Sequence, residues 1–297
     1  MAIEGYRFRV ETALQQLIEN MGEKGALRDA CEYALMNGGK RLRPILVLMI
    51  GNALGGKRDV VQVALSVECF HTASLIADDL PCMDNDDVRR LRPALHKAFS
   101  ESTAILASYV LIAEGYGGIH RCCQKGMEEV AILCLEAATR CAGIQGATNG
   151  QFLDLSPPNA QLDTIRKIIY QKTVTLFEIA FVFGWLFGGG GKDLLDEVKS
   201  CANHLGMAFQ IADDLLDDLQ DGVDSINIAK ACGRSEAQRL FSSEMKDFST
   251  SLKRLGLWNQ DFEGVVSWLW RYCPPEHWDD QTGVGASGAT FLPESLA

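Results

Sequence analysis

The sequence predicts an all-α protein, built as a single domain of about ten or more helices. Apolar residues recur at steps of three and four along most of the 297-residue chain, which is the period of an α-helix. The apolar–polar alternation typical of strands is nearly absent, as are internal linkers and repeats of solenoid length. We therefore expect one helical domain over residues 1–273. The remaining residues, 274–297, begin with two prolines and predict an irregular tail.

The helices are delimited by apolar stripes and by glycine or proline at their ends. Gly38 and Gly39 end the second predicted helix, because glycine commonly follows a helix end. Pro44 suits the first position of the next helix, and the glycines at 188–191 separate two later ones. The ranges expected to be helical are 10–21, 27–35, 45–54, 60–79, 100–113, 127–142, 162–187, 194–218, 229–255 and a last helix that closes over 265–270.

Composition excludes several classes of protein. Hydrophobic residues make up 47% of the chain, which is enough for a large core and too many for a disordered protein. The 28 Lys and Arg against 39 Asp and Glu give a net charge of -11, which makes nucleic acid and anionic membrane surfaces poor partners. An anionic substrate would therefore need local cations or metal ions.

Cysteine usage and the N-terminal residues bear on localisation. The ten cysteines form no C-x-x-C pair, and most lie in apolar contexts typical of buried free thiols. The chain shows no signal-peptide pattern at its start, and its longest apolar run, residues 104–113, is about half a membrane span. We expect a soluble cytoplasmic protein with no integral membrane segment.

Two clusters of aspartates follow apolar helical runs. The first consists of Asp78, Asp79, Asp84, Asp86 and Asp87, and the second of Asp213, Asp214, Asp217 and Asp218. Asp213 and Asp217 are four residues apart, so they share a helix face and repel each other by about 4 kcal/mol at 4 Å in a partly screened environment. One interpretation is a charged surface face. The other, which two such clusters favour, is a site for hard cations, and magnesium fits because it takes one or two carboxylates and fills its shell with water and phosphate.

Basic residues lie near both clusters. We predict anion binding by Lys40, Arg43, Arg89 and Arg90, because a diphosphate needs planar bidentate donors in addition to metal. For Arg41 and Arg92 we expect plain surface ion pairs. Lys172 interrupts an apolar helix and is expected either to extend its ammonium group to the surface or to face a polar cavity. His71 lies seven residues before Asp78, two turns away on one face, and is either a core histidine or an anion ligand.

These residues occur in motifs that resemble those of the trans-isoprenyl diphosphate synthases, the short-chain polyprenyl synthases. The motifs, in the family's order, are GGKRLRP (38–44), DDLPCMD (78–84), GQFLD (150–154), KT (172–173) and QIADDLLD (210–217). The similarity spans roughly residues 27–255, and the two extra residues in the first aspartate motif resemble the bacterial and plastid branch.

The resemblance implies an isoprenoid synthase fold around a deep apolar cavity, a homodimer and about three Mg²⁺ per active site. Asp78 and Asp84, supported by Asp79, would hold two of the ions, and Asp213, assisted by Asp217, the third. The residues implied to bind the allylic diphosphate are Arg89 and Lys172, and those for isopentenyl diphosphate are Lys40, Arg43, His71 and Arg90. Thr173 and Gln210 would place oxygen dipoles near the developing carbocation.

The implied reaction is magnesium-assisted ionisation, condensation and elimination. Metal ions and Arg or Lys side chains would stabilise the departing diphosphate, and a closed apolar cavity would keep the carbocation from water. The released diphosphate can take the final proton, which explains the missing side-chain base.

The sequence departs from the family pattern at three places. Residues 91–94 read Leu-Arg-Pro-Ala where the family has Gly-x-Pro-Thr, and Ser108-Tyr109 stands where the family has Gly-Asp. A lysine usual after the second aspartate motif is replaced near Ser225, with Lys230 as a candidate substitute. These departures leave the metal ligands intact and put the rate and allylic affinity in question.

Product length is predicted from the helix before Asp78. Ala73 and Ser74 are small and would line the floor of the prenyl pocket, whereas Phe70 lies one turn deeper, about 5.4 Å or nearly one isoprene unit. We expect Phe70 to stop chain growth at geranylgeranyl diphosphate, with farnesyl diphosphate as the other possible product. Two alternatives stay open: another class I terpenoid synthase, which would not need the GGKRLRP loop, and a non-catalytic regulatory subunit of a prenyl synthase.

Overall fold

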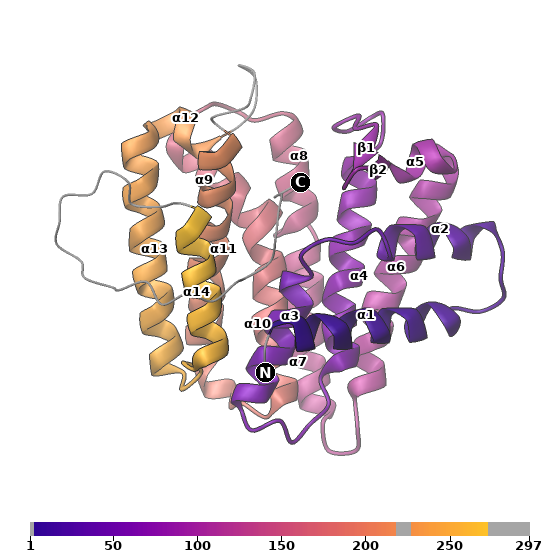
Figure 1. Ribbon diagram of the computed structural model, residues 1–297, viewed down its shortest axis with the longest axis horizontal. Coiled ribbons are helices and arrows are strands. Elements are labelled where there is room, and N and C mark those ends of the chain that lie inside the picture. The colour runs from indigo at the N-terminus through magenta and orange to yellow at the C-terminus, as the bar shows by residue number, and fades with distance from the viewer. Residues whose placement is uncertain (1–2, 218–226, 273–297) are drawn as a thin grey trace.

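The computed structural model describes residues 3–217 and 227–272, and in these residues the protein is almost entirely helical (Figure 1). The helices are α1 (Ile3–Glu19), α2 (Ala26–Leu35), α3 (Leu42–Ala53), α4 (Val61–Asp78), α5 (Leu95–Ala98), α6 (Glu101–Cys122), α7 (Glu128–Ala142), α8 (Ala147–Leu155), α9 (Leu162–Ile169), α10 (Thr175–Gly188), α11 (Leu195–Asp217), α12 (Ile228–Cys232), α13 (Arg234–Arg254) and α14 (Gln260–Tyr272). A π-helical turn, η1 (Tyr170–Val174), joins α9 to α10, and a 3-10 turn, η2 (Lys192–Leu194), precedes α11. The predicted tail, 274–297, lies outside the described residues.

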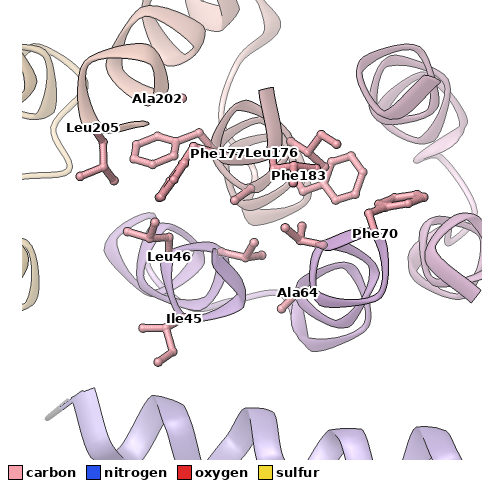
Figure 2. Packing of buried hydrophobic residues seen from close by; sticks show 14 of the residues in the cluster. Ile45, Leu46, Ala64, Phe70, Leu176, Phe177, Phe183, Ala202 and Leu205 are labelled. Atoms are coloured by element: carbon pink, nitrogen blue, oxygen red, sulfur yellow. The ribbon is translucent and has the colours of Figure 1, made fainter. Parts of the chain in front are cut away.

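Helix α10 is the centre of the core, and all of its side chains are buried. Figure 2 shows α10 residues Leu176, Phe177 and Phe183 between helices α3, α4 and α11. A Cβ on Gly188 would lie 3.2 Å from the Cα of Gly51 in α3, so these two helices approach at small residues. Burying large apolar side chains on every face of one helix makes it the element around which the others pack.

Helices α4 and α6 pack closely along their length. A Cβ on Gly118 would lie 2.7 Å from the carbonyl oxygen of Gln62, and one on Gly115 would lie 2.6 Å from the ring of Phe70. Helix α6 runs through both glycines to Cys122, nine residues past the predicted end. The glycines allow a close helix–helix approach here rather than ending the helix.

Several helix boundaries differ from the prediction for local reasons. Helix α3 begins at Leu42, so Pro44 is its third residue and not its first; proline is tolerated there because the first-turn N–H groups have no partner within the helix. Gly233, with a φ of 85°, separates α12 from α13. Helix α8, which contains the whole GQFLD motif, was not predicted.

The two aspartate clusters lie at one end of the bundle. Helix α4 ends at Asp78 and α11 ends at Asp217, and Figure 1 shows α8, α12 and the short strands β1 (Val88–Arg89) and β2 (Arg92–Pro93) at this same end. The antiparallel strands pair Val88 with Pro93 and Arg89 with Arg92. This hairpin carries the basic residues back over the end of α4.

One stretch of the described residues, Glu128–Leu155, is long and apolar enough to cross a membrane by length and composition alone. It comprises α7 and α8, with a turn over residues 143–146 between them. Such a stretch is weak evidence, because core helices of soluble proteins pass the same test. The predicted lack of an integral membrane segment therefore stays a prediction.

Candidate functional site

Arg43, His71 and Arg90 come together at the start of α3. The Nη1 of Arg43 lies 3.4 Å from Nε2 of His71 in α4, and the guanidinium of Arg43 stacks 4.5 Å from the ring centroid of Phe177. Arg90 reaches the same loop from the hairpin and donates to the carbonyl oxygen of Gly38 at 2.5 Å. Three of the four residues predicted to bind isopentenyl diphosphate therefore form one group.

The polarity of this group suits an anion. Burial lowers the pKa of Arg43 to about 10, although Glu68 and Asp213 attract its charge. Burial, with Arg43 and Arg90 adding to it, lowers the pKa of His71 well below its usual value, so His71 is neutral at pH 7. Within the described residues, Nε of Arg43 and Nδ1 of His71 are buried without a hydrogen-bond partner. Buried polar atoms normally have partners, so a ligand with acceptor and donor oxygens fits here.

Lys40, the fourth predicted residue, turns toward α11 and α14. Its Nζ lies 5.3 Å from the ring centroid of Phe209 and 5.7 Å from that of Trp268. Such cation–π contacts hold the ammonium group at the edge of the site. The predicted role of Lys40 in diphosphate binding stays a prediction.

Arg41 is buried, and the expected surface ion pair is wrong. Its backbone is left-handed with a φ of 52°, which turns the side chain inward. Its guanidinium donates to Glu11 at 2.8 Å, to Glu68 at 2.5 Å and to the carbonyl oxygen of Leu35. These bonds join α1, α2 and α4 to the loop that carries Lys40 and Arg43, so Arg41 holds the loop rather than a substrate. Arg92 instead stacks on Tyr33 at 4.0 Å.

In the first aspartate cluster, Asp79 and Arg89 form a pair. Asp79 is 3% exposed and accepts from Nε of Arg89 at 2.9 Å and also from Nη2. Arg89 also reaches Asp86 at 3.0 Å. The pair borders a pocket between α2, α4 and the hairpin, which is lined by Tyr33, Ala34, Asn37, Thr72, Leu75, Ile76, Asp79, Arg89, Arg90, Pro93 and Leu95. In the structure the Asp79 carboxylate fixes the Arg89 side chain, and its predicted support of the metal ions stays a prediction.

Asp78 and Asp84 lie near Lys172. Burial raises the pKa of Asp78 to about 7; Lys172 opposes this shift and Asp84 adds to it. The Oδ2 of Asp84 is 3.9 Å from Nζ of Lys172. Burial disfavours the charged form of Lys172, but Asp154, Asp78 and Asp84 outweigh it and raise its pKa. A buried carboxylate beside a second carboxylate is ionised more readily when a cation is bound.

Helix α8 contributes residues whose roles were not predicted. Asp154 accepts from Nζ of Lys172 at 2.5 Å, and Gln151 donates to Asp84 at 3.1 Å. A Cβ on Gly150 would clash with the backbone nitrogen of Lys172, so only glycine lets α8 approach η1 this closely. The GQFLD motif could have pointed to these contacts, but no pattern in it indicates which residue Asp154 meets.

The π-helical turn η1 directs neighbouring side chains to the two clusters. Lys172 pairs with Asp84 of the first aspartate cluster and with Asp154 of α8. The hydroxyl of Thr173 instead donates to Oε1 of Gln210 in α11 at 2.9 Å. Such turns often occur at functional sites. Gln210 is four residues before Asp214 and donates to it at 2.8 Å.

In the second cluster, Asp213 lies close enough to attract the charge of Arg43. The side chain of Asp217, at the last residue of α11, and all of Asp218 and Ser225 lie outside the description. Lys230 is exposed in α12. The pairing of Asp213 with Asp217 on one metal therefore stays a prediction.

The donor set suits magnesium. Among the described residues no group of three or more His, Cys, Asp and Glu side chains is close enough to enclose a metal ion. Hard carboxylate oxygens at Asp78, Asp84 and Asp213, spread over two helix ends, instead match an ion that takes one or two protein ligands and completes its shell with water and phosphate.

The residues predicted to set product length lie along α4. Phe70 is 4% exposed, and its ring packs edge-on against Tyr116 of α6 with centroids 5.1 Å apart. Ala73 is buried one turn later, and the hydroxyl of Ser74 donates to the carbonyl oxygen of His71 at 2.9 Å. The structure thus places Phe70 between α4 and α6, one turn below the two small residues.

Two of the departures from the family pattern lie at the surface. Leu91, at the turn between β1 and β2, has a φ of 62° and is 87% exposed, so it occupies a left-handed position where glycine would be unstrained. Tyr109 is 63% exposed on α6. Neither residue belongs to the groups around Arg43 or Lys172.

Comparison with known proteins agrees with this geometry. A family model described as polyprenyl synthetase matches residues 24–234. The heterodimeric geranylgeranyl pyrophosphate synthase large subunit 2 of Arabidopsis thaliana is 34% identical over 233 residues, which are 76% of this chain and 60% of that protein. The farnesyl diphosphate synthase of Bacillus subtilis is 35% identical over 212 residues, 70% of this chain and 72% of that protein. The chain thus spans about 60% of the length of the Arabidopsis relative.

The solved structures confirm the predicted isoprenoid synthase fold. A geranyltransferase from Legionella pneumophila superposes with a TM-score of 0.81 at 29% identity, over 91% of this chain and 95% of that one. Fold, motif order and sequence identity agree across more than two thirds of the chain. The chain belongs to the polyprenyl synthetase family.

Proposed function

We propose that this protein is a short-chain trans-prenyltransferase that condenses isopentenyl diphosphate with an allylic diphosphate. The observation that carries the proposal is the group of Arg43, His71 and Arg90, in which Nε of Arg43 and Nδ1 of His71 are buried without partners among the described residues. A second diphosphate site beside the aspartate clusters is needed for chain elongation. A cyclase, which uses one diphosphate substrate, has no need of it.

The residues of the chain divide between two diphosphates. Arg43, Arg90 and neutral His71 bind the isopentenyl diphosphate, with Lys40 at the edge of their group. Lys172 and Arg89 bind the allylic diphosphate, and both are held by carboxylates, Asp154 and Asp79. Cations that are already fixed toward a leaving group need little reorganisation during the reaction. Such electrostatic preorganisation is usually the largest single contribution to catalysis.

Magnesium would be held by Asp78, Asp84 and Asp213, with Asp79 and Asp217 in support, and when bound it neutralises charge on the leaving diphosphate. The hydroxyl oxygen of Thr173 and Oε1 of Gln210, which are hydrogen-bonded to each other, orient toward positive charge on the prenyl chain. No protein base is assigned, because the released diphosphate takes the proton lost on elimination. Apolar side chains around the prenyl chain exclude water from the carbocation.

We further propose geranylgeranyl diphosphate as the main product, with Phe70 as the limit on chain growth. Phe70→Ala is expected to lengthen the product by about one isoprene unit, because removal of the ring frees space of one helix turn beside Gly115 and Tyr116. Ala73→Phe is expected to shorten the product. Radiolabelled products sized by chromatography would measure both changes.

Phe241→Ala is the matched control for Phe70→Ala. Phe241 is fully buried in α13 against Trp270, so its truncation makes a comparable cavity far from α4. Its product length should not change. Equal product lengths in wild type and Phe70→Ala would remove Phe70 from this role.

We propose that the protein is cytoplasmic. We also propose that it forms a homodimer whose interface is made by α6 and α7. The large apolar side chains that this face exposes are Ile105, Leu106, Tyr109, Ile112, Ile132 and Leu135. Helices α6 and α7 pack against each other, and a second copy is the occupant that covers the apolar side chains they expose. Light scattering should give the mass of two chains for wild type and of one chain for Ile132→Asp/Leu135→Asp; a monomeric wild type would contradict the proposal.

The direct test of the activity uses purified protein, magnesium and isopentenyl diphosphate with dimethylallyl, geranyl or farnesyl diphosphate as starter. Formation of longer linear prenyl diphosphates supports the proposal. Cyclic or hydrolysed products from the allylic substrate alone would favour another class I terpenoid synthase. No product with any starter would favour a non-catalytic regulatory subunit.

A further inference from the structure

Asp214, next to the predicted metal ligand Asp213, is buried and uses both of its carboxylate oxygens within the protein. It is 5% exposed. Its Oδ1 accepts from Nε2 of Gln210 at 2.8 Å, and its Oδ2 accepts from the backbone nitrogen of Ile228 at 2.7 Å. The side chain of Asn227 donates to the backbone oxygen of Asp214 at 2.7 Å. Asp214 therefore joins α11 to the first residue of α12.

These bonds fix which way the Gln210 amide faces. Both Asp214 oxygens accept from N–H groups, so Gln210 turns its NH₂ group toward Asp214. The amide oxygen, Oε1, then points the other way, where it accepts from the hydroxyl of Thr173 at 2.9 Å. Without Asp214, the Thr173 hydroxyl alone would not fix the amide, because a hydroxyl can either donate to the amide oxygen or accept from the amide NH₂ group.

We propose that Asp214 is a positioning residue for prenyl transfer and not a metal ligand. Its carboxylate holds the Gln210 oxygen, and through it the Thr173 hydroxyl, with negative dipole ends toward the prenyl carbocation. The inference rests on the proposed prenyl transfer and adds a role for a residue whose side chain the metal site does not need. Two N–H donors already occupy the Asp214 carboxylate, whereas coordination of a cation would need at least one of its oxygens to turn away.

Asp214→Asn tests the orientation directly. The single amide oxygen of this variant can accept from the Ile228 nitrogen or from Gln210, but not from both, and its NH₂ group then faces a donor. If the backbone bond is kept, Gln210 must flip, which places its NH₂ group toward Thr173 and reverses the dipole. We expect kcat to fall by about tenfold to a hundredfold, the size of effect that misplacement of a group by about 1 Å has. The magnesium concentration for half-maximal rate and both KM values should change less than threefold.

The double variant Gln210→Glu/Asp214→Asn separates positioning from a merely structural role. Its carboxylate at position 210 can accept both from the amide NH₂ group at position 214 and from the Thr173 hydroxyl. The amide oxygen at position 214 still accepts from the Ile228 nitrogen. The bonds to the Ile228 nitrogen, to the residue at position 210 and to Thr173 are restored, with the same net charge and an oxygen again facing Thr173. We expect most of the lost kcat to return.

Asp196→Asn, at a fully exposed position of the same helix, is the control and should match wild type in kcat. A tenfold or greater rise in the magnesium requirement of Asp214→Asn would overturn the proposal, because it would make Asp214 a ligand. Failure of the double variant to recover kcat would overturn it too. Both results require an active wild type; an inactive wild type would instead contradict the proposed function.

Discussion

Asp213→Ala is expected to lower kcat by about 10³-fold. The substitution removes the carboxylate of the second cluster that lies beside Arg43. Metal-ion stabilisation of a leaving group is worth several kcal/mol, and each tenfold change in rate corresponds to about 1.4 kcal/mol. Steady-state kinetics with geranyl and isopentenyl diphosphate at varied magnesium would measure the loss. The magnesium requirement should rise as well, because one of the proposed ligands is absent.

A binding measurement separates this effect from misfolding. Magnesium with inorganic diphosphate should raise the melting temperature of the wild type, because ligands of the folded state stabilise it by mass action, and should raise that of Asp213→Ala much less. The apo variant should still unfold in one cooperative transition, since the substitution leaves the buried core around α10 intact. Asp196→Ala, exposed at the start of α11, should behave as wild type. Unchanged turnover in Asp213→Ala would contradict the assignment.

Gly39→Ala is expected to raise the KM for isopentenyl diphosphate by about a hundredfold while the KM for the allylic substrate changes little. Gly39 has a φ of 105°, and a Cβ at this position would lie 2.6 Å from Nη2 of Arg90 and closer still to the central carbon of that guanidinium. The methyl group therefore displaces Arg90 from its place beside Arg43 and His71. Loss of one charge-assisted contact to a diphosphate costs roughly 1.5–3 kcal/mol of binding free energy, which weakens affinity by about one to two powers of ten.

Gly38→Ala is the matched control for Gly39→Ala. Gly38 also has a positive φ, 75°, but nothing lies within 4 Å of its Cβ position. Both variants place an alanine in left-handed backbone, which costs about 1–2 kcal/mol of stability, and only Gly39→Ala also displaces Arg90. Equal KM values for isopentenyl diphosphate in the two variants would show that the effect comes from backbone strain and not from Arg90.

The helices were predictable where burial is periodic and uninterrupted. The expected ranges 60–79 and 194–218 agree within one residue with α4 (Val61–Asp78) and α11 (Leu195–Asp217). The expected end of α6 was wrong because Gly115 and Gly118 serve contact with α4, and spacing alone cannot distinguish a packing glycine from a terminating one. The π-helical turn at Lys172 has no signature in residue type.

The site was predictable as a set of residue types but not as a set of partners. The order of motifs indicates diphosphate and metal binding, and the structure brings Arg43, His71 and Arg90 into one group as expected. The partners of the cations depend on tertiary packing: Asp154 reaches Lys172 from another helix. Arg41 looked like a surface residue because its acceptors, the half-buried Glu11 and the buried Glu68, are distant in sequence.

Carboxylates of both aspartate clusters are proposed to coordinate divalent cations that bind the same diphosphate. This proposal is tested most directly by a crystal structure of the protein grown with magnesium and a thio analogue of an allylic diphosphate that cannot ionise. We expect cations that bridge diphosphate oxygens to Asp78 and Asp84 on one side and to Asp213 on the other. A diphosphate bound without any cation at these carboxylates, or bound away from Lys172 and Arg89, would contradict it.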